Sequence, residues 1–172
     1  AVFRAFREAV RPLDEAGKLG CVLLQYPFGF KPLPQTASHW RWSVDRLKPW
    51  PVAVEFRNSA WLTADTFAAL RAAGAGFCAV DEPRLPGLVP PVAVSTGPPA
   101  YVRFHGRNAA KWWKHKEAWE RYDYLYSREE LEAWAPKVRG LEAETGTAYV
   151  VFNNCHAGQA ASNALLMREL LG

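Results

Sequence analysis

The sequence of 172 residues is poor in cysteine and has no long apolar run. Its three cysteines make an odd number without C-x-x-C spacing, which argues against a disulfide framework and against a structural zinc ribbon. No stretch approaches the roughly 20 apolar residues that a membrane-spanning helix needs, and the amphipathic start lacks the apolar core of a secretory signal. We therefore predict a protein of a reducing, cytoplasmic setting that does not cross a membrane.

Motifs for nucleotides and metals are also missing. No G-x-G-x-x-G or G-x-x-x-x-G-K-S/T turn follows an apolar run, so Rossmann and P-loop nucleotide binding lose their main support. No H-x-H or H-E-x-x-H spacing supports a metal site, although Glu55, Asp81, His105 and His156 carry suitable ligand atoms. The sequence thus predicts no metal and identifies no cofactor.

Composition and charge are those of an ordinary globular protein. A hydrophobic fraction of 49% with 22% charged residues suits one domain, which we assign to residues 1–172. The net charge of +4 and a pI near 9.1 permit acidic or phosphorylated partners without demanding them. The sequence indicates no oligomeric state.

Short apolar runs predict an α/β fold. Five runs have the β-branched and aromatic character of parallel strands that are buried on both faces. They span residues 20–25, 52–56, 76–80, 100–104 and 148–152. Helical periodicity alternates with these runs, as on the face formed by Trp40, Val44 and Leu47. This alternation implies parallel crossovers, in either an open doubly wound sheet or part of a (β/α)8 barrel.

Several residues predict where helices begin and end. Pro34 suits a first helical turn, and Thr63 suits an N-cap. Ser127 and Glu130 have the spacing of a capping box, and Pro136 should kink or restart the helix that follows. Another helical face, ahead of the first strand, consists of Phe3, Phe6, Val10 and Leu13.

Two connections are longer than the usual length of about 2 to 6 residues. Residues 82–99 contain six prolines and should form a stiff excursion. Residues 106–127, which include Trp112 and Tyr124, interleave aromatic and basic side chains. That mixture suits stacking on nucleic-acid bases or sugars beside phosphate contacts. A lid that packs its rings over the strand ends explains it equally well.

Polar side chains stand at the carboxyl end of every predicted strand. They are Gln25; Glu55 and Arg57; Asp81; Arg103, His105 and Arg107; and Asn153, Asn154 and His156. Because side chains alternate along a strand, Glu55 and Arg57 share one face, as do Arg103 and His105. We therefore predict an anion-binding site capable of acid/base chemistry. The alternative is that Glu55–Arg103 or Asp81–Arg57 pairs merely neutralise one another.

The segment 153–159 leads into the last predicted helix. Asn154 is placed to cap that helix, whose free amides would then suit a phosphate or carboxylate. An ordinary cap without a ligand is the alternative. Cys155 beside His156 resembles a nucleophile–base pair only in sequence, and sequence neighbours rarely have the required geometry.

Seven stretches over nearly the whole chain carry a family signature. They are residues 20–27 (GCVLLQYP), 53–61 (AVEFRNSAW), 79–82 (AVDE), 101–108 (YVRFHGRN), 121–127 (RYDYLYS), 151–154 (VFNN) and 159–164 (QAASNA). In order and spacing they resemble the YecE-like family of uncharacterised proteins, domain of unknown function 72. The resemblance implies a TIM-type (β/α)8 barrel with its site at the carboxyl ends of the strands. The family's opening strands have no counterpart before Ala1, so we expect about strands four to eight and a missing N-terminal portion.

Three functions follow from these patterns. The leading one is an enzyme that acts on a phosphorylated or otherwise anionic small molecule, with Glu55, Asp81 and His105 moving protons. The ligand-binding residues would be Gln25, Arg57, Arg103, Arg107, Trp112, Tyr124, Asn153, Asn154, His156 and Gln159. The second is a nucleic-acid-binding or metal-dependent phosphodiesterase-like barrel, which rests partly on fold analogy. The third is a ligand-binding module without catalysis.

Overall fold

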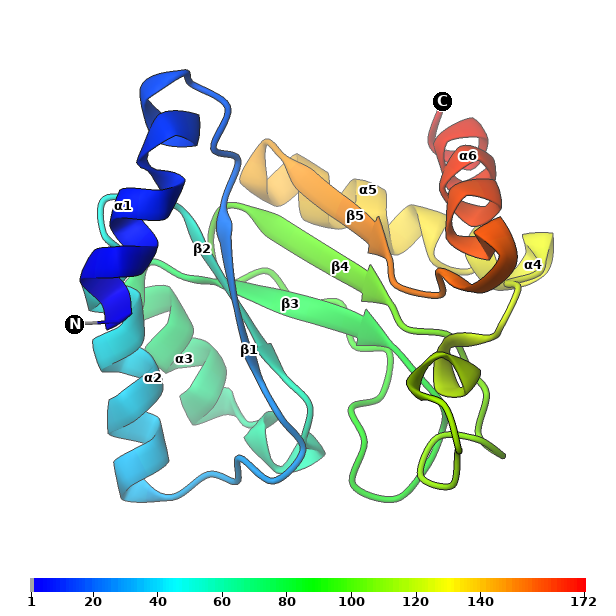
Figure 1. The fold of residues 1–172 in the computed structure, drawn as a ribbon. Helices are drawn as coiled ribbons and strands as arrows, with labels where there is room; N and C mark the ends of the chain where they lie inside the picture. Colours follow the sequence, from blue (N-terminus) through cyan, green and yellow to red (C-terminus); the bar gives the residue numbers. More distant parts are fainter. Residues whose placement is uncertain (1) are drawn as a thin grey trace.

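A computed structural model describes residues 2–172 and contains one five-stranded parallel sheet in the order β1-β2-β3-β4-β5 (Figure 1). The strands are β1 (Val22–Tyr26), β2 (Val52–Phe56), β3 (Gly76–Asp81), β4 (Ala100–Phe104) and β5 (Ala148–Phe152). The predicted α/β fold is therefore confirmed, and only the first strand begins later than its apolar run suggests. Because neighbours in the sheet are neighbours in the chain, β1 and β5 form its two edges.

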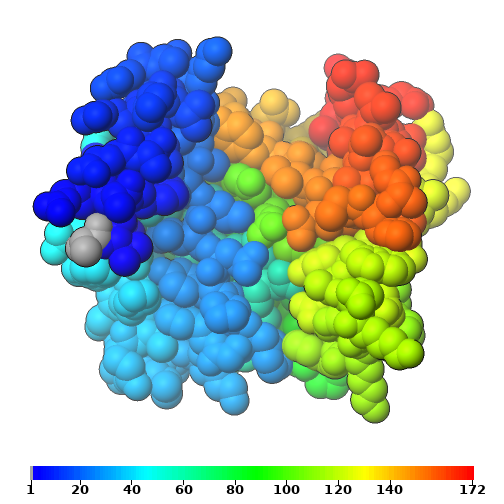
Figure 2. All heavy atoms as spheres, in the orientation of Figure 1, coloured from blue at the N-terminus to red at the C-terminus, as the bar shows by residue number. Residues whose placement is uncertain are grey.

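Helices flank the sheet. They are α1 (Val2–Glu15), α2 (Pro34–Leu47), α3 (Ala64–Ala73), α4 (Arg128–Glu132), α5 (Ala135–Thr145) and α6 (Gln159–Leu171). Short 3-10 turns are η1 (Ser59–Trp61), η2 (Ala118–Tyr122) and η3 (His156–Gly158). On the side away from the main core, Figure 2 shows a hollow between the blue N-terminal segment and the red C-terminal helix. No helix within residues 2–172 has the length and apolarity needed to span a membrane.

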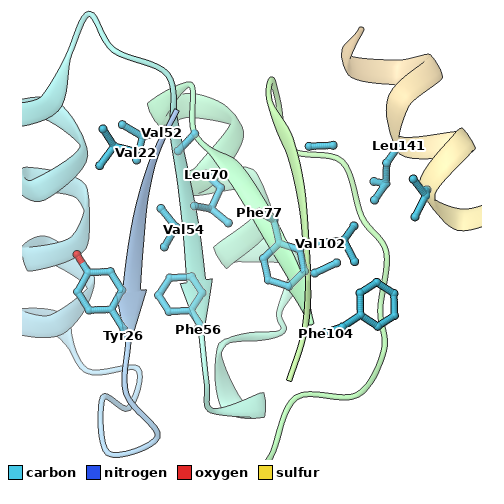
Figure 3. Packing of buried hydrophobic residues seen from close by; sticks show 14 of the residues in the cluster. Val22, Tyr26, Val52, Val54, Phe56, Leu70, Phe77, Val102, Phe104 and Leu141 are labelled. Carbon is cyan, nitrogen blue, oxygen red and sulfur yellow. The ribbon is translucent and has the colours of Figure 1, made fainter. Parts of the chain in front are cut away.

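The main hydrophobic core lies between the sheet and its helices (Figure 3). Val54, Phe56, Val102 and Phe104 alternate with polar neighbours, so each strand directs its apolar side chains to the helices. Trp40 of α2 packs edge-on against Phe56, with ring centroids 6.1 Å apart. The opposite face of the sheet carries the polar residues between them, together with a smaller apolar cluster of Cys78, Val80 and Val89.

The predicted helix signals at Pro34, Thr63, Ser127 and Pro136 hold in the structure. Thr63 caps α3 by accepting a hydrogen bond from the Thr66 amide at 3.1 Å, and Ser127 and Glu130 form the capping box of α4. Pro136 restarts the helix, since α4 ends before it and α5 begins at the preceding residue. These signals succeed because each depends on a few residues that are close in sequence.

Two segments differ from an ideal strand–helix repeat. The α1 face is only partly covered: Phe6 is 41% and Leu13 50% exposed, and α2 is the main element against which α1 packs. The proline-rich residues 82–99 cross from β3 to β4 without a helix. Thr96 fastens this crossing, since its hydroxyl accepts from the Phe77 amide at 2.7 Å and donates to the Ala75 carbonyl at 2.8 Å.

Candidate functional site

The carboxyl ends of β2 and β4 place four charged or titratable side chains on the face of the sheet opposite the helices. Glu55 and Arg57 come from β2 and its end, and Arg103 and His105 come from β4 and its end. The predicted sharing of faces is confirmed by their mutual contacts. Strand alternation explains this grouping, because Phe56 and Phe104 occupy the helix side.

Glu55 is the centre of the group and is fully buried. Its Oε1 accepts a hydrogen bond from Nε2 of His105 at 2.9 Å, and its Oε2 accepts one from Nη1 of Arg103 at 2.6 Å. Nη1 of Arg57 lies 3.3 Å from Oε1. The carboxylate is thus held by two guanidinium groups and one imidazole, which compensates its burial.

The imidazole of His105 is neutral near pH 7. Burial lowers the pKa of His105 to about 4, and the nearby positive charge of Arg57 acts in the same direction, against the hydrogen bond to Glu55. Burial alone would raise the pKa of Glu55, but His105, Arg103 and Arg57 outweigh it and lower that pKa to about 2. The pair therefore consists of a carboxylate and a neutral imidazole that donates from Nε2, which leaves Nδ1 as the acceptor, 3.4 Å from Nη1 of Arg57.

Arg103 connects the ends of four strands. Besides Glu55, its Nη1 donates to Oε1 of Gln25 at 2.8 Å, and its Nη2 donates to Oδ1 of Asn153 at 3.1 Å. Gln25 is the penultimate residue of β1, and Asn153 directly follows β5. The structure therefore brings together Gln25, Glu55, Arg57, Arg103, His105 and Asn153 from the residues named in the sequence analysis. The Glu55–Arg103 ion pair foreseen in the alternative interpretation is also present.

Glu82 belongs to this group although it was not among the predicted site residues. Its buried carboxylate accepts from Nη2 of Arg57 at 2.7 Å and from the Val89 amide at 2.9 Å. Burial raises the pKa of Glu82, against the opposing charge of Arg57. Strand alternation could have identified it, because Glu82 is two residues beyond Val80, which pairs in register with Arg103.

Asp81 lies in a separate network on the helix side. It pairs in register with Phe104, and Arg107 donates to both of its oxygens at 2.7 Å. Tyr126 Oη donates to its Oδ1 at 2.9 Å, and Trp134 Nε1 donates to its Oδ2 at 2.7 Å. The structure thus does not bring Asp81 and Arg107 together with the Glu55–His105 pair. The predicted Asp81–Arg57 pair is absent from the described residues, since Arg57 binds Glu82 instead.

Residues 106–126, which we call the lid loop, cover the strand ends and lie beyond the arrowheads of β3 and β4 in Figure 1. The two ends of the loop meet where the Gly106 amide donates to Tyr126 Oη at 2.9 Å. Gly106 has a φ of +86°, and a Cβ there would lie 3.0 Å from Cβ of Tyr124, so both conformation and space favour glycine.

Trp112 points from the lid loop into the molecule and is 1% exposed. The guanidinium carbon of Arg57 lies 5.5 Å from its ring centroid, and that of Arg121 lies 5.9 Å away. A cleft of about 140 Å³ opens beside these groups. Its walls include Gln25, Phe28, Arg57, Trp112, Arg121 and Tyr122. Trp112 therefore packs as a lid residue rather than as an exposed stacking platform.

The segment after β5 holds the lid loop in place. Nδ2 of Asn154 donates to the Tyr124 carbonyl at 2.7 Å, and Oε1 of Gln159 accepts from the Tyr124 amide at 3.0 Å. The ring of His156 stacks on Trp119 at 4.2 Å. The prediction that Asn154 caps the last helix is wrong, because η3 intervenes and Gly158 occupies the N-cap of α6.

Tyr124 is likewise part of the lid-loop anchor. Its hydroxyl donates to Oε1 of Glu130 at 2.6 Å, and Arg107 binds the same oxygen at 2.7 Å. Burial, together with the Glu130 carboxylate, raises the pKa of Tyr124 to about 12. This position connects Tyr124 with the Asp81 network and not with the cleft.

The comparisons with known proteins agree with the motifs along the chain. The family model described as "Protein of unknown function DUF72" matches residues 1–172. The chain belongs to the DUF72 family. A curated relative, the UPF0759 protein YunF of Bacillus subtilis (strain 168), is 34% identical over an alignment of 180 positions that covers 99% of the DUF72 chain and 64% of YunF.

Solved structures resemble the DUF72 chain closely. A DUF72 family protein from Thermotoga maritima is 41% identical, with a TM-score of 0.91 over 98% of this chain and 64% of that one. Another from Enterococcus faecalis is 31% identical, with a TM-score of 0.89 over the same shares. The DUF72 chain thus spans 64% of the length of these relatives.

The DUF72 site combines a neutral imidazole, an ionised carboxylate and guanidinium groups. Such a set can bind an anion and move a proton. In the closed arrangement Glu55 and His105 are both fully buried, and the lid loop covers them through Trp112 and Tyr122. The Cys78 thiol, with Sγ 3.9 Å from Oε2 of Glu55, is fully buried, and burial raises its pKa well above its usual range.

Proposed function

We propose that this site binds a small anionic molecule and that the protein is an enzyme acting on it. The observation that carries the proposal is a pair of cationic side chains on one cleft. Arg57 and Arg121 both line it, and within residues 2–172 each has a buried Nε–H group without a hydrogen-bond partner. An unpaired buried donor costs about 1–3 kcal/mol, and an oxyanion would supply the missing acceptor.

In this proposal Glu55 and His105 form the acid/base pair. Glu55 orients the imidazole by accepting from Nε2, so that Nδ1 takes a proton from the ligand. Arg57 and Arg103 bind the anionic group, with Gln25 and Asn153 fixing Arg103. We assign Asp81 a positioning role instead of proton transfer, because Arg107, Tyr126 and Trp134 occupy its oxygens.

A (β/α)8 barrel remains our proposal for the complete architecture. It is supported by the parallel order of the strands, by the two unpaired sheet edges at β1 and β5, and by the greater length of the relatives. Three further strands would then close the hollow in Figure 2 and complete the walls of the cleft. The domain that we assign to residues 1–172 would in that case be part of one larger barrel domain.

Ligand screening tests the proposal. The full-length protein should show thermal stabilisation by members of a phosphometabolite panel, and the Arg103→Ala and His105→Ala variants should lose it. Arg84→Ala is the matched control, because Arg84 is exposed on the proline-rich connection and does not line the cleft. The proposal would be abandoned if both site variants kept the full ligand-induced shift.

A second candidate is binding to single-stranded nucleic acid. Trp113 and Trp119 of the lid loop are 50% and 47% exposed beside exposed lysines, which suits base stacking and phosphate contacts. Salt-dependent retention on DNA, together with zinc or manganese in elemental analysis, would favour a metal-dependent phosphodiesterase-like barrel.

Tight binding of a small anion without turnover would instead favour a non-catalytic ligand-binding module.

A further inference from the structure

The lid loop is anchored firmly at its base. Arg107 at its start binds Asp81, and Tyr126 at its end binds the same carboxylate. The loop is also bonded internally: Nδ2 of Asn108 donates to the carbonyls of Glu120 and Asp123 at 3.0 and 3.2 Å. A loop with a fixed base and internal bonds can move its tip as a unit.

The tip, residues 109–121, is attached differently. Within residues 2–172, no hydrogen bond or ion pair joins it to a residue outside the lid loop. Its contacts with the rest of the molecule are aromatic or cation–π: Trp113 against Phe28 at 5.1 Å, Trp119 against His156, and Trp112 beneath Arg57. Such contacts can be broken without leaving a buried polar group unpaired, so the tip is the part of the lid loop best able to open.

Arg121 is the cation that the tip brings to the cleft. Its guanidinium lies over the rings of Trp112 and Tyr122, at 5.9 and 5.8 Å. Its Nη2 is 3.0 Å from Nε2 of His115, and its Nε has no partner among the described residues. No carboxylate in residues 2–172 forms an ion pair with it, whereas Arg57 is paired with Glu55 and Glu82.

We propose that an oxyanion of the ligand, a phosphate or carboxylate group, bridges Arg57 and Arg121 and so holds the lid loop closed. This inference rests on the proposed function and adds a ligand-binding residue on the lid. Both guanidinium groups line the same cleft and pack against Trp112, so a ligand that fills the cleft meets both. The two Nε–H groups are enclosed in the closed state, so the anion enters while the tip is open and is trapped on closure.

The experiment measures binding of inorganic pyrophosphate to the full-length protein. Chloride at the same ionic strength is the reference. Calorimetry should show that Arg121→Gln weakens pyrophosphate binding about tenfold or more, the loss expected for a charge-assisted hydrogen bond. Arg121→Lys should retain part of the affinity. Lys114→Gln, which removes the same charge from an exposed position of the same tip, should bind as the wild type does.

Hydrogen exchange of residues 109–121 supplies the second readout. Saturating pyrophosphate should slow it in the wild type and in Lys114→Gln, but not in Arg121→Gln. If the wild type and Arg121→Gln bind pyrophosphate with equal affinity, the bridge between Arg57 and Arg121 is wrong. Weak pyrophosphate binding by Arg57→Gln in the same experiment would then leave the proposed function standing. If Arg121→Gln binds pyrophosphate weakly but pyrophosphate does not slow the hydrogen exchange of residues 109–121 in any of the proteins, then binding is not coupled to closure of the lid loop. Failure of the wild type to bind would overturn the proposed function and the bridge with it.

Discussion

Replacing His105 by glutamine should make the stability of the protein less dependent on pH. The imidazole titrates near its ordinary pKa of 6.5 in the unfolded chain and near 4 in the folded protein. Between these values the unfolded chain binds the additional proton, so stability falls as the pH is lowered. Glutamine keeps an N–H donor for Glu55 but does not titrate.

The magnitude follows from the burial of His105. The free energy of unfolding falls by about 1.4 kcal/mol for each pH unit in which His105 is protonated only in the unfolded chain. Between pH 7.5 and pH 5 the wild type therefore loses about 2 kcal/mol of stability through His105. Glu55 does not contribute in this range, because its pKa in the folded protein is about 2 and its ordinary value is 4.5.

Urea unfolding of both proteins at pH 7.5 and pH 5 measures this difference. Comparison with His105→Gln cancels the contribution of the other histidines to the pH dependence, because both proteins contain them. The wild type should lose about 2 kcal/mol more than the variant between the two pH values. An identical loss in the two proteins would show that His105 is not held neutral by burial, and the acid/base role proposed for it would lose its basis.

Three other substitutions test separate parts of the structure. Asp81→Asn should lower the free energy of unfolding in a urea titration by about 3 kcal/mol, because it disrupts the buried ion pair between Asp81 and Arg107. The control Asp65→Asn, at an exposed position, should change that free energy little. Glu82→Gln should tighten pyrophosphate binding about tenfold in calorimetry, because Arg57 then loses the closer of its two carboxylate partners. Unchanged or weaker binding would count against Arg57 as an anion ligand. Trp112→Ala should speed hydrogen exchange of the lid tip about tenfold, and unchanged exchange would show that other contacts hold the tip.

Local signals predicted most of the fold. Strand runs, the Thr63 cap and the restart at Pro136 depend on residues close in sequence, and all are confirmed. The first helix was less predictable, since the exposure of Phe6 and Leu13 depends on what packs against α1 rather than on its own periodicity. Burial of a helix face is a tertiary property, and periodicity shows only which residues could be buried.

The site was predictable only as far as strand alternation reaches. Alternation grouped Glu55 with Arg57 and predicted the shared face with His105. It could not decide which carboxylate each guanidinium would bind, because that choice depends on the strand register and on the path of the loops. Asp81 therefore proved to be a partner of Arg107, and Glu82 proved to be the partner of Arg57.

The central claim is that the Arg57–Arg121 cleft above the Glu55–His105 pair binds an anion. A crystal structure of the full-length protein with pyrophosphate tests it most directly. We expect a phosphate group that contacts both guanidinium groups beneath a closed lid loop, with Trp112 in place. Pyrophosphate bound elsewhere at saturating concentration, with the cleft occupied only by water, would contradict it.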